Sequence, residues 1–346
     1  MLTVKVLPAN GGDCLLVSFG KEKSIKNILI DGGIGTTYKK TLKAEIEKIK
    51  KAEQSIDLLV VTHSHEDHIN GIIKFIEDDK NSDCIKKVWF NSGVHFDREK
   101  VKLLKQESDN SDISVRKIKY LEDKLIEMSF MGKGIWNDEL IIQGDIEKVG
   151  EATLTVLSPS SDGIERLKTL TAEIRDTNIA GKEYDYSTKL ADFQLDDFVE
   201  DDNMENATSI SFLFEYEGKR ILFLADSLPS VVVEGLKLTR VLEESNKIDY
   251  VKLSHHASKG NLNNELLEMI ECENYIVSTF GMSSNKLPNK ETFARIVQYH
   301  KSINLYFNYK NEKIESIFED DVLETDEYSI ELVYVEDNSY EIGILK

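Results

Sequence analysis

A cluster of metal-binding side chains at residues 63–68 constrains this chain more than any other feature. The segment reads HSHEDH and directly follows an apolar run at residues 56–61 that is typical of a buried strand. Isoleucines then recur at helical spacing, so the cluster lies on a strand-to-helix turn. The alternative is that Asp67 caps a helix and that the histidines are ordinary surface residues. Three of the chain's seven histidines fall within these six positions, which favours a metal site.

The spacing within the cluster suggests how metal ions would be held. Alternate residues of an extended segment share one face, so His63 and His65 can bind one ion. Asp67 and His68 begin the next turn and point elsewhere. They suit a second ion close by.

The motif His-x-His-x-Asp-His after an apolar strand resembles the signature of the metallo-β-lactamase-fold hydrolases. Residues 7–17 (LPANGGDCLLV) and 28–33 (ILIDGG) are similar to the opening of one branch, the DNA-uptake competence hydrolases and phosphorylcholine esterases. Residues 224–227 (LADS) and 253–259 (LSHHASK) resemble the aspartate and double-histidine motifs of that branch. The resemblance extends from about residue 3 to about residue 300. It implies an α/β fold, the metallo-β-lactamase-type αββα sandwich.

The resemblance also implies a ligand set for two divalent ions. The first ion would be held by the imidazoles of His63 and His65. The second would be held by the carboxylate of Asp67 and the imidazoles of His68 and His256. The carboxylate of Asp226 would bridge the two ions. Two such ions hold one hydroxide between them and polarise the bond under attack. Imidazole and carboxylate ligands suit zinc, and manganese and iron stay open as alternatives.

Asp67 and His255 are the predicted catalytic residues. His255 and His256 are adjacent, so their side chains are expected to diverge, one toward the metal and the other toward the substrate. Relatives with a single histidine align with His256, which makes His256 the predicted ligand. His255 would then stabilise charge on the substrate or protonate the leaving group. The reverse assignment of the pair stays open.

Three positions depart from the family pattern. Many members place another histidine for the first ion in the loop that corresponds to residues 201–209, where this chain has none. Asn206 or water would complete that ion's ligands, or the ion would bind weakly. Ala257 stands where the branch has glycine, and residues 285–288 (NKLP) lack a histidine before the proline. The last two departures leave the metal ligands intact and concern the substrate.

Two further polar residues near predicted strand ends have open interpretations. Asp13 follows a turn at residues 10–12 and either supports the metal loop through hydrogen bonds or is a simple turn residue. His95 follows a predicted strand, and a lone histidine there is more typical of a loop residue than of a ligand.

The chain has 346 residues and a formal net charge of −20, which argues against indiscriminate nucleic-acid binding. It does not exclude a nuclease, because bound metal ions reverse the local charge. Three widely spaced cysteines make neither a disulfide framework nor a zinc–thiolate site. The chain shows no signal peptide and no apolar run long enough to span a bilayer, so we expect a cytoplasmic protein.

The predicted organisation is one hydrolase domain, residues 1–300, with a small C-terminal β extension at residues 301–346. Residues 305–308, 329–335 and 340–345 suggest a small antiparallel sheet packed on the same domain. Residues 160–205 form a polar, increasingly acidic insertion, with seven acidic residues and no Lys or Arg between Asp192 and Glu205. This insertion is interpreted as a lid or a site for a regulatory protein partner, or as a solubilising loop.

The predicted function is metal-dependent hydrolysis of a phosphodiester, in nucleic acid or a nucleotide. The branch resemblance motivates this, and two ions suit an in-line displacement at phosphorus. Lys259, just after the histidine pair, is the nearest basic candidate for a phosphate contact. The alternatives are a lactone, thioester or other carbon-ester hydrolase, and an effector that is inactive until a partner protein binds.

Overall fold

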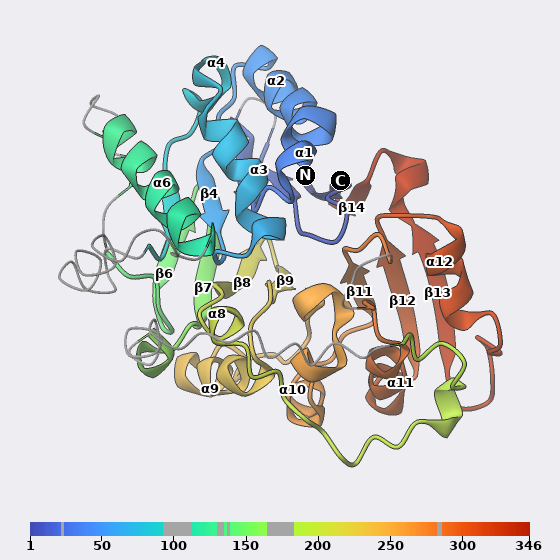
Figure 1. Ribbon diagram of the computed structural model, residues 1–346. Coiled ribbons are helices and arrows are strands. Elements are labelled where there is room, and N and C mark those ends of the chain that lie inside the picture. The colour runs from blue at the N-terminus through green and yellow to red at the C-terminus, as the bar shows by residue number, and fades with distance from the viewer. Residues whose placement is uncertain (22–23, 93–112, 130–134, 137–138, 165–182, 282–285) are drawn as a thin grey trace.

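The computed structural model describes residues 1–21, 24–92, 113–129, 135–136, 139–164, 183–281 and 286–346. Figure 1 shows two sheets with helices on their outer sides. Within the described residues, the first sheet has the order β14-β1-β2-β3-β4-β5, which are Glu341–Leu345, Leu2–Val6, Leu15–Phe19, Lys26–Ile30, Leu58–Val61 and Val88–Phe90. The second has the order β13-β12-β11-β10-β9-β8-β7-β6, which are Ser329–Tyr334, Ser302–Phe307, Asn274–Val277, Tyr250–Lys252, Lys219–Phe223, Ser211–Tyr216, Ala152–Ser158 and Ile146–Val149.

Helices pack on the outer face of each sheet (Figure 1). The first sheet is covered by α1 (Gly35–Thr37), η2 (Tyr38–Leu42), α2 (Lys43–Lys51), α3 (Glu66–Ile76), α4 (Asp79–Ser82) and α6 (Ile113–Met128). The second is covered by α9 (Pro229–Thr239), α10 (Asn264–Met269) and α11 (Lys290–Tyr299). One apolar core lies under each helix layer and a third lies between the sheets. The predicted αββα sandwich is confirmed.

Strand β4 shows how the sequence produces these layers. Its four residues, LLVV, are all buried. Leu59 and Val61 belong to the core under the helices, whereas Leu58 and Val60 belong to the core between the sheets. A strand buried on both faces requires a continuous apolar run, and the chain becomes polar only where this strand ends.

The prediction of a small antiparallel C-terminal sheet is wrong. β12 pairs in parallel with β11 and with β13, which extends the second sheet. β14 pairs antiparallel with β1 at the edge of the first sheet. The apolar patterns of these strands were visible, but their partners lie far away in the sequence, so local periodicity could not identify them. The division of the chain at residue 300 stays a prediction.

Some predicted features lie wholly or partly outside the described residues. These are His95 and residues 165–182 of the acidic insertion. Within the described part of the chain, no helix is long and apolar enough to cross a membrane.

Candidate metal centre

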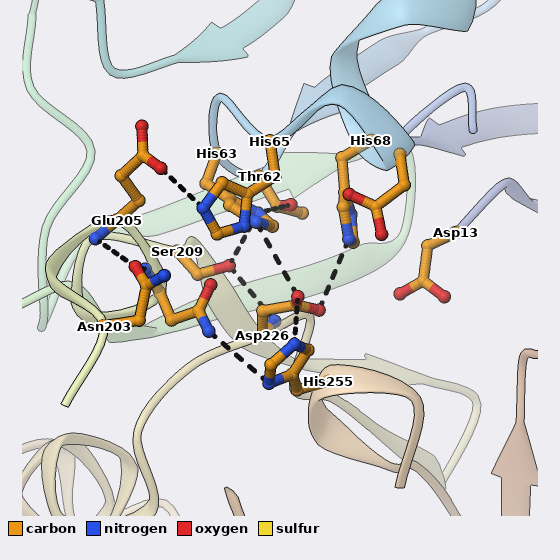
Figure 2. A network of polar contacts seen from close by, with 12 residues as sticks. Asp13, Thr62, His63, His65, His68, Asn203, Glu205, Ser209, Asp226 and His255 are labelled. Atoms are coloured by element: carbon orange, nitrogen blue, oxygen red, sulfur yellow. Dashed lines mark hydrogen bonds and ion pairs between the residues drawn. The ribbon is translucent and has the colours of Figure 1, made fainter. Parts of the chain in front are cut away.

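Strand ends and the turns that follow them bring the candidate ligands together. His63, His65 and the first turn of α3 follow β4, Asp226 follows β9, and the histidine pair follows β10. Figure 2 shows His63, His65, His68, Asp226 and His255 gathered around one point between the sheets. Open α/β sheets characteristically collect functional groups at the carboxyl ends of strands.

Glycines allow the loops around this point to approach one another closely. A Cβ on Gly71 would lie 1.7 Å from the carbonyl oxygen of Gly32, and one on Gly12 would lie 1.8 Å from that of Asp67. The Gly32 amide donates a hydrogen bond to the carbonyl of His68 at 2.9 Å. The glycines predicted at these turns therefore serve close backbone contact with the first turns of α3.

The first ligand group consists of His63, His65 and Asp226, whose candidate ligand atoms lie within 4.8 Å of one another. His63 Nε2 is 3.7 Å from Asp226 Oδ2. Its other ring nitrogen, Nδ1, lies 3.0 Å from the Thr62 hydroxyl and 3.3 Å from the Ser209 hydroxyl. These contacts leave Nε2 free to face the centre of the group.

His65 is oriented by an acidic residue from the second half of the chain. Its Nε2 lies 2.5 Å from Glu205 Oε2, and the Ser64 hydroxyl donates to the same carboxylate at 3.1 Å. This leaves Nδ1 as the nitrogen of His65 available to a metal ion. Figure 2 shows Glu205 on the far side of His65 from Asp226.

The second ligand group consists of Asp67, His68 and His256, also within 4.8 Å. His68 Nε2 is 3.4 Å from Asp226 Oδ1, and His256 Nε2 is 3.4 Å from Asp67 Oδ2. His256 Nδ1 donates to the Ser278 carbonyl at 2.9 Å. Asp226 therefore faces both groups, with one oxygen toward His63 and the other toward His68.

Asp31 orients histidines of both groups. His68 Nδ1 donates to its carboxylate at 2.7 Å, and the Thr62 hydroxyl donates to the same oxygen at 2.7 Å. Because that hydroxyl already donates to Asp31, it must accept from His63 Nδ1. One buried carboxylate thus selects the same tautomer, with Nε2 unprotonated, in both neutral rings.

The buried atoms without partners test whether metal ions fit. Among the described residues, the buried side-chain atoms that lack a hydrogen bond include Nε2 of His63, of His68 and of His256, and Oδ1 of Asp226. Leaving such atoms unpaired in an interior is costly, and here they converge. Imidazole nitrogens and carboxylate oxygens are the donor set of zinc and similar divalent ions. The residues therefore fit two ions, although their role as ligands stays a prediction.

The electrostatics of the cluster favour bound positive charge. Burial raises the pKa of Asp226, but His68 and His255 outweigh burial and hold it well below its usual range. Burial lowers the pKa of His68, but Asp226, Asp31 and Asp67 raise it well above normal. Burial and two neighbouring histidines keep the pKa of His63 well below its usual value. The carboxylates thus attract cations, and a neutral imidazole is the form that binds metal.

The two adjacent histidines diverge because the backbone is left-handed at both. His255, His256 and Ala257 have φ angles of 45°, 55° and 65°. His256 is buried in the second group, whereas the His255 side chain is 21% exposed. Ala257 occupies the position where glycine is expected from the resemblance, and its positive φ explains that expectation. The alanine tolerates this conformation at a cost of order 1 kcal/mol.

His255 lies beside the first group rather than the second. Its Nε2 is 3.9 Å from Asp226 Oδ2, the oxygen that also faces His63. Its Nδ1 lies 3.1 Å from Asn261 Oδ1 and 3.4 Å from Asp201 Oδ2. These two acceptors favour a proton on Nδ1, which places the lone pair of the neutral ring on Nε2, toward the centre.

The loop without a histidine brings Asn206 to this same side. Asn206 is fully buried, and its Nδ2 donates to Asp201 at 2.6 Å and lies 3.4 Å from His255 Nδ1. Its Oδ1 has no hydrogen-bond partner among the described residues. Asn206 completing the first ion's ligands stays a prediction.

Residues 9–157 match the metallo-β-lactamase superfamily. A domain of the superfamily named in the stated resemblance is thereby confirmed at these residues, whereas the competence and phosphorylcholine esterase branch is not shown. Members of the superfamily are mostly metal-dependent hydrolases that bind divalent ions. None of the curated proteins matches the chain.

Several solved structures resemble the whole chain at low identity. The metallo-beta-lactamase fold protein YhfI from Bacillus subtilis shares 11% identity at a TM-score of 0.43, with 96% of each chain covered. Zn(2+)-bound PqqB from Methylobacterium extorquens shares 11% sequence identity at a TM-score of 0.41, with 99% of this chain and 100% of that chain covered. A diphosphatase of the PhnP family shares 12% sequence identity at a TM-score of 0.39, with 96% of this chain and 94% of that chain covered. At these TM-scores the likenesses carry no argument about function.

Sequence reasoning missed several residues that orient the candidate ligands. Asp31 was part of a recognised motif but had no assigned role, and Glu205 stood in a segment noted for its acidity and its missing histidine. Ser209 and Ser278 carried no signal, because serine near a strand end is common. Asp13 supports the second group by contact, as one of its two interpretations anticipated: its amide donates to the Asp67 carbonyl at 3.2 Å.

Proposed function

We propose that this protein is a metal-dependent hydrolase that uses a two-ion site to cleave phosphodiesters in nucleic acid or a nucleotide. The observation that carries the proposal is the convergence of unpaired histidine nitrogens on the two oxygens of Asp226. A carboxylate facing two ligand groups suits a pair of ions, and such a pair suits in-line displacement at phosphorus. The motifs of residues 7–17 and 253–259 support the phosphodiester over other substrates.

The chain's own residues would orient the reaction. Bound ions would lower the pKa of a water molecule between them and polarise the phosphoryl oxygens. Asp31, Glu205 and the Ser278 carbonyl hold three histidine rings in the orientation that such ions need. Asp67 lies opposite His256, so its carboxylate would bind the second ion and orient the attacking water.

His255 has a different task from the other histidines. It is partly exposed, and its Nε2 faces the centre beside Asp226. Asp201 Oδ2 and Asn261 Oδ1 both face Nδ1 of this ring. In the protonated ring, Nε2 is placed to donate a proton to the leaving oxygen as the phosphorus–oxygen bond breaks.

The experiment that tests this function combines metal analysis with a substrate panel. The purified chain, loaded in turn with zinc, manganese and iron, is assayed on bis(p-nitrophenyl) phosphate, a single-stranded oligonucleotide, a lactone and a thioester. We expect metal-dependent phosphodiester cleavage that a chelator abolishes. Lactone or thioester turnover without phosphodiester cleavage under every metal would overturn the phosphodiester assignment and favour the carbon-ester alternative.

As a second proposal, a regulatory protein partner acts on the site through residues 160–205. One observation supports it. The end of this insertion carries Asp201 and Glu205, which contact His255 and His65. A partner that moved this segment would change the orientation of both histidines. Assaying the chain with and without co-purifying proteins tests this, and equal activity in both preparations would contradict it.

A further inference from the structure

A buried lysine joins the two sheets next to the second ligand group. Lys252 is the last residue of β10, in the second sheet, and its ammonium forms an ion pair with Asp13, in the loop between β1 and β2 of the first sheet. Both side chains are 1% exposed. Lys252 lies outside the motifs that were used to assign the ligands, and the proposed reaction does not use it.

Asp13 contacts both parts of the second ligand group. Its backbone amide donates to the Asp67 carbonyl at 3.2 Å, and its carbonyl accepts from the Gly33 amide at 2.7 Å. Its Oδ1 lies 3.5 Å from His256 Nδ1 and has no hydrogen-bond partner among the described residues. One short segment therefore lies against the turn that carries Asp67 and against the ring of His256.

Lys252 also fills a position that would otherwise attract a metal ion. Asp13, Asp31 and His68 form a third group whose candidate ligand atoms lie within 4.8 Å of one another. The ammonium of Lys252 binds Asp13 in this group, and Asp31 already accepts hydrogen bonds from Thr62 and His68. A resident cation thus offsets the charge of one of the two carboxylates in this group.

Stability alone does not account for such a pair. Taking two charges out of water costs about as much as their attraction returns, and apolar residues of similar size are often equally stable. A buried ion pair is better explained by the geometry that it imposes on its neighbours. Here those neighbours are candidate ligands of one ion.

We propose that Lys252 and Asp13 are positioning residues for the second metal ion, holding the Asp67 turn and the His256 ring at the separation that one ion requires. The observed separation is 3.4 Å between Asp67 Oδ2 and His256 Nε2. This inference rests on the two-ion site of the proposed function. It makes no assumption about the substrate.

The test removes both charges together, so that no unpaired charge remains to unfold the protein. The double variant Lys252→Met/Asp13→Asn is stripped of metal and titrated calorimetrically with zinc, then with manganese. We expect the dissociation constant of the second ion to rise about 10- to 100-fold, as when other residues that support metal ligands are changed. The constant for the first ion should stay within about twofold of that of the parent.

A matched control is available within the chain. Lys290 and Asp321 form another buried ion pair, with side chains 0% and 2% exposed, and Lys290 donates to the Tyr186 carbonyl rather than to a candidate ligand. Lys290→Met/Asp321→Asn should bind both ions as the parent does. If the Lys252 variant does not fold by circular dichroism, Lys252→Gln/Asp13→Asn, which fills the same space with uncharged polar groups, takes its place with the same expected loss.

Two other results would have distinct meanings. Unchanged constants for both ions in a folded Lys252 variant would overturn the positioning role and leave the proposed function intact. A parent chain that binds fewer than two ions would overturn the two-ion function, and the positioning role with it.

Discussion

Each candidate histidine is oriented by a different partner on the nitrogen that does not face the centre. His68 uses a carboxylate, His256 a backbone carbonyl, and His63 two hydroxyl groups. His65 is the exception in geometry, because Glu205 takes its Nε2. A carboxylate partner raises the basicity of its ring more than a carbonyl or a hydroxyl does. His65 and His68, one from each group, are therefore the stronger candidate ligands.

Asp226 is the residue on which both groups depend. Its Oδ2 faces His63 at 3.7 Å and its Oδ1 faces His68 at 3.4 Å. Asp226→Ala should therefore lose both ions or nearly so, and activity with them. Elemental analysis of the purified variant checks this against the parent prepared in the same way. Metal content equal to that of the parent would show that Asp226 does not bridge.

The adjacent histidines offer a direct comparison between two neighbouring side chains. His256→Ala should lose the second ion, because its Nε2 faces Asp67 at 3.4 Å in a buried group. His255→Ala should keep both ions but lose about 100-fold or more in kcat, as expected for a lost proton donor. Metal content and kcat are measured on the same preparations.

The reverse result would be equally informative. If His255→Ala loses metal while His256→Ala keeps it, the assignments are exchanged. His255 would then act as a ligand of the first ion, a position that its distance of 3.9 Å from Asp226 Oδ2 allows.

The candidate ligands that the sequence could suggest by itself are those with a spacing signal. HSHEDH at residues 63–68 is local, so its chemistry could be interpreted directly from the sequence. Asp226 and His256 were found only through motif resemblance, since a strand-end aspartate by itself is ordinary. The positions of Lys252 and Glu205 beside the candidate ligands could not be predicted, because each contacts a residue more than 100 positions away in the sequence.

At the level of elements, close packing between the β1–β2 loop and the start of α3 shapes the second group. Gly12 lies so near the Asp67 carbonyl that a methyl group cannot fit without moving one of the two loops. Gly12→Ala should weaken binding of the second ion more than binding of the first. It should also lower the free energy of unfolding by about 1–3 kcal/mol. Metal titration and urea unfolding measure the two effects.

Gly343→Ala is the matched control for this substitution. Gly343 lies on β14, and a Cβ there would meet nothing within 4 Å. It should leave both metal constants unchanged. Equal metal binding by Gly12→Ala and Gly343→Ala would show that the loop approach does not control the site.

Elements whose partners are adjacent in sequence are the ones that local apolar patterns can predict. The first three strands and the β4–α3 turn follow from alternating or continuous apolar runs with turn residues between them. β14 is different, because it pairs with β1 across nearly the whole chain. Its amphipathic pattern indicates a strand but contains no information about which edge it joins.

Over the whole molecule, negative charge limits how a polyanionic substrate can bind. The formal net charge is −20, and two described basic side chains close in sequence to candidate ligands or packed on α3 are already paired. The Nζ atom of Lys259, the predicted phosphate contact, lies 2.9 Å from Glu291 Oε2. Lys117 forms an ion pair with Glu66 at the start of α3. The site would therefore hold a nucleic acid through its metal ions and few side chains, which favours single strands or ends over intact duplex.

Few phosphate contacts imply a shallow dependence of binding on salt. The logarithm of the binding constant falls with the logarithm of salt concentration by about 0.7 per phosphate contact on a single strand. Two or three contacts give a slope of about −1.4 to −2.1, whereas a protein that makes six to ten contacts loses about 10³- to 10⁵-fold in affinity between roughly 50 and 200 mM salt. We expect kcat/KM for a single-stranded oligonucleotide to follow the shallow slope, with duplex cleaved far more slowly. A steep slope, or faster cleavage of duplex, would show that a basic surface outside the metal centre binds the substrate.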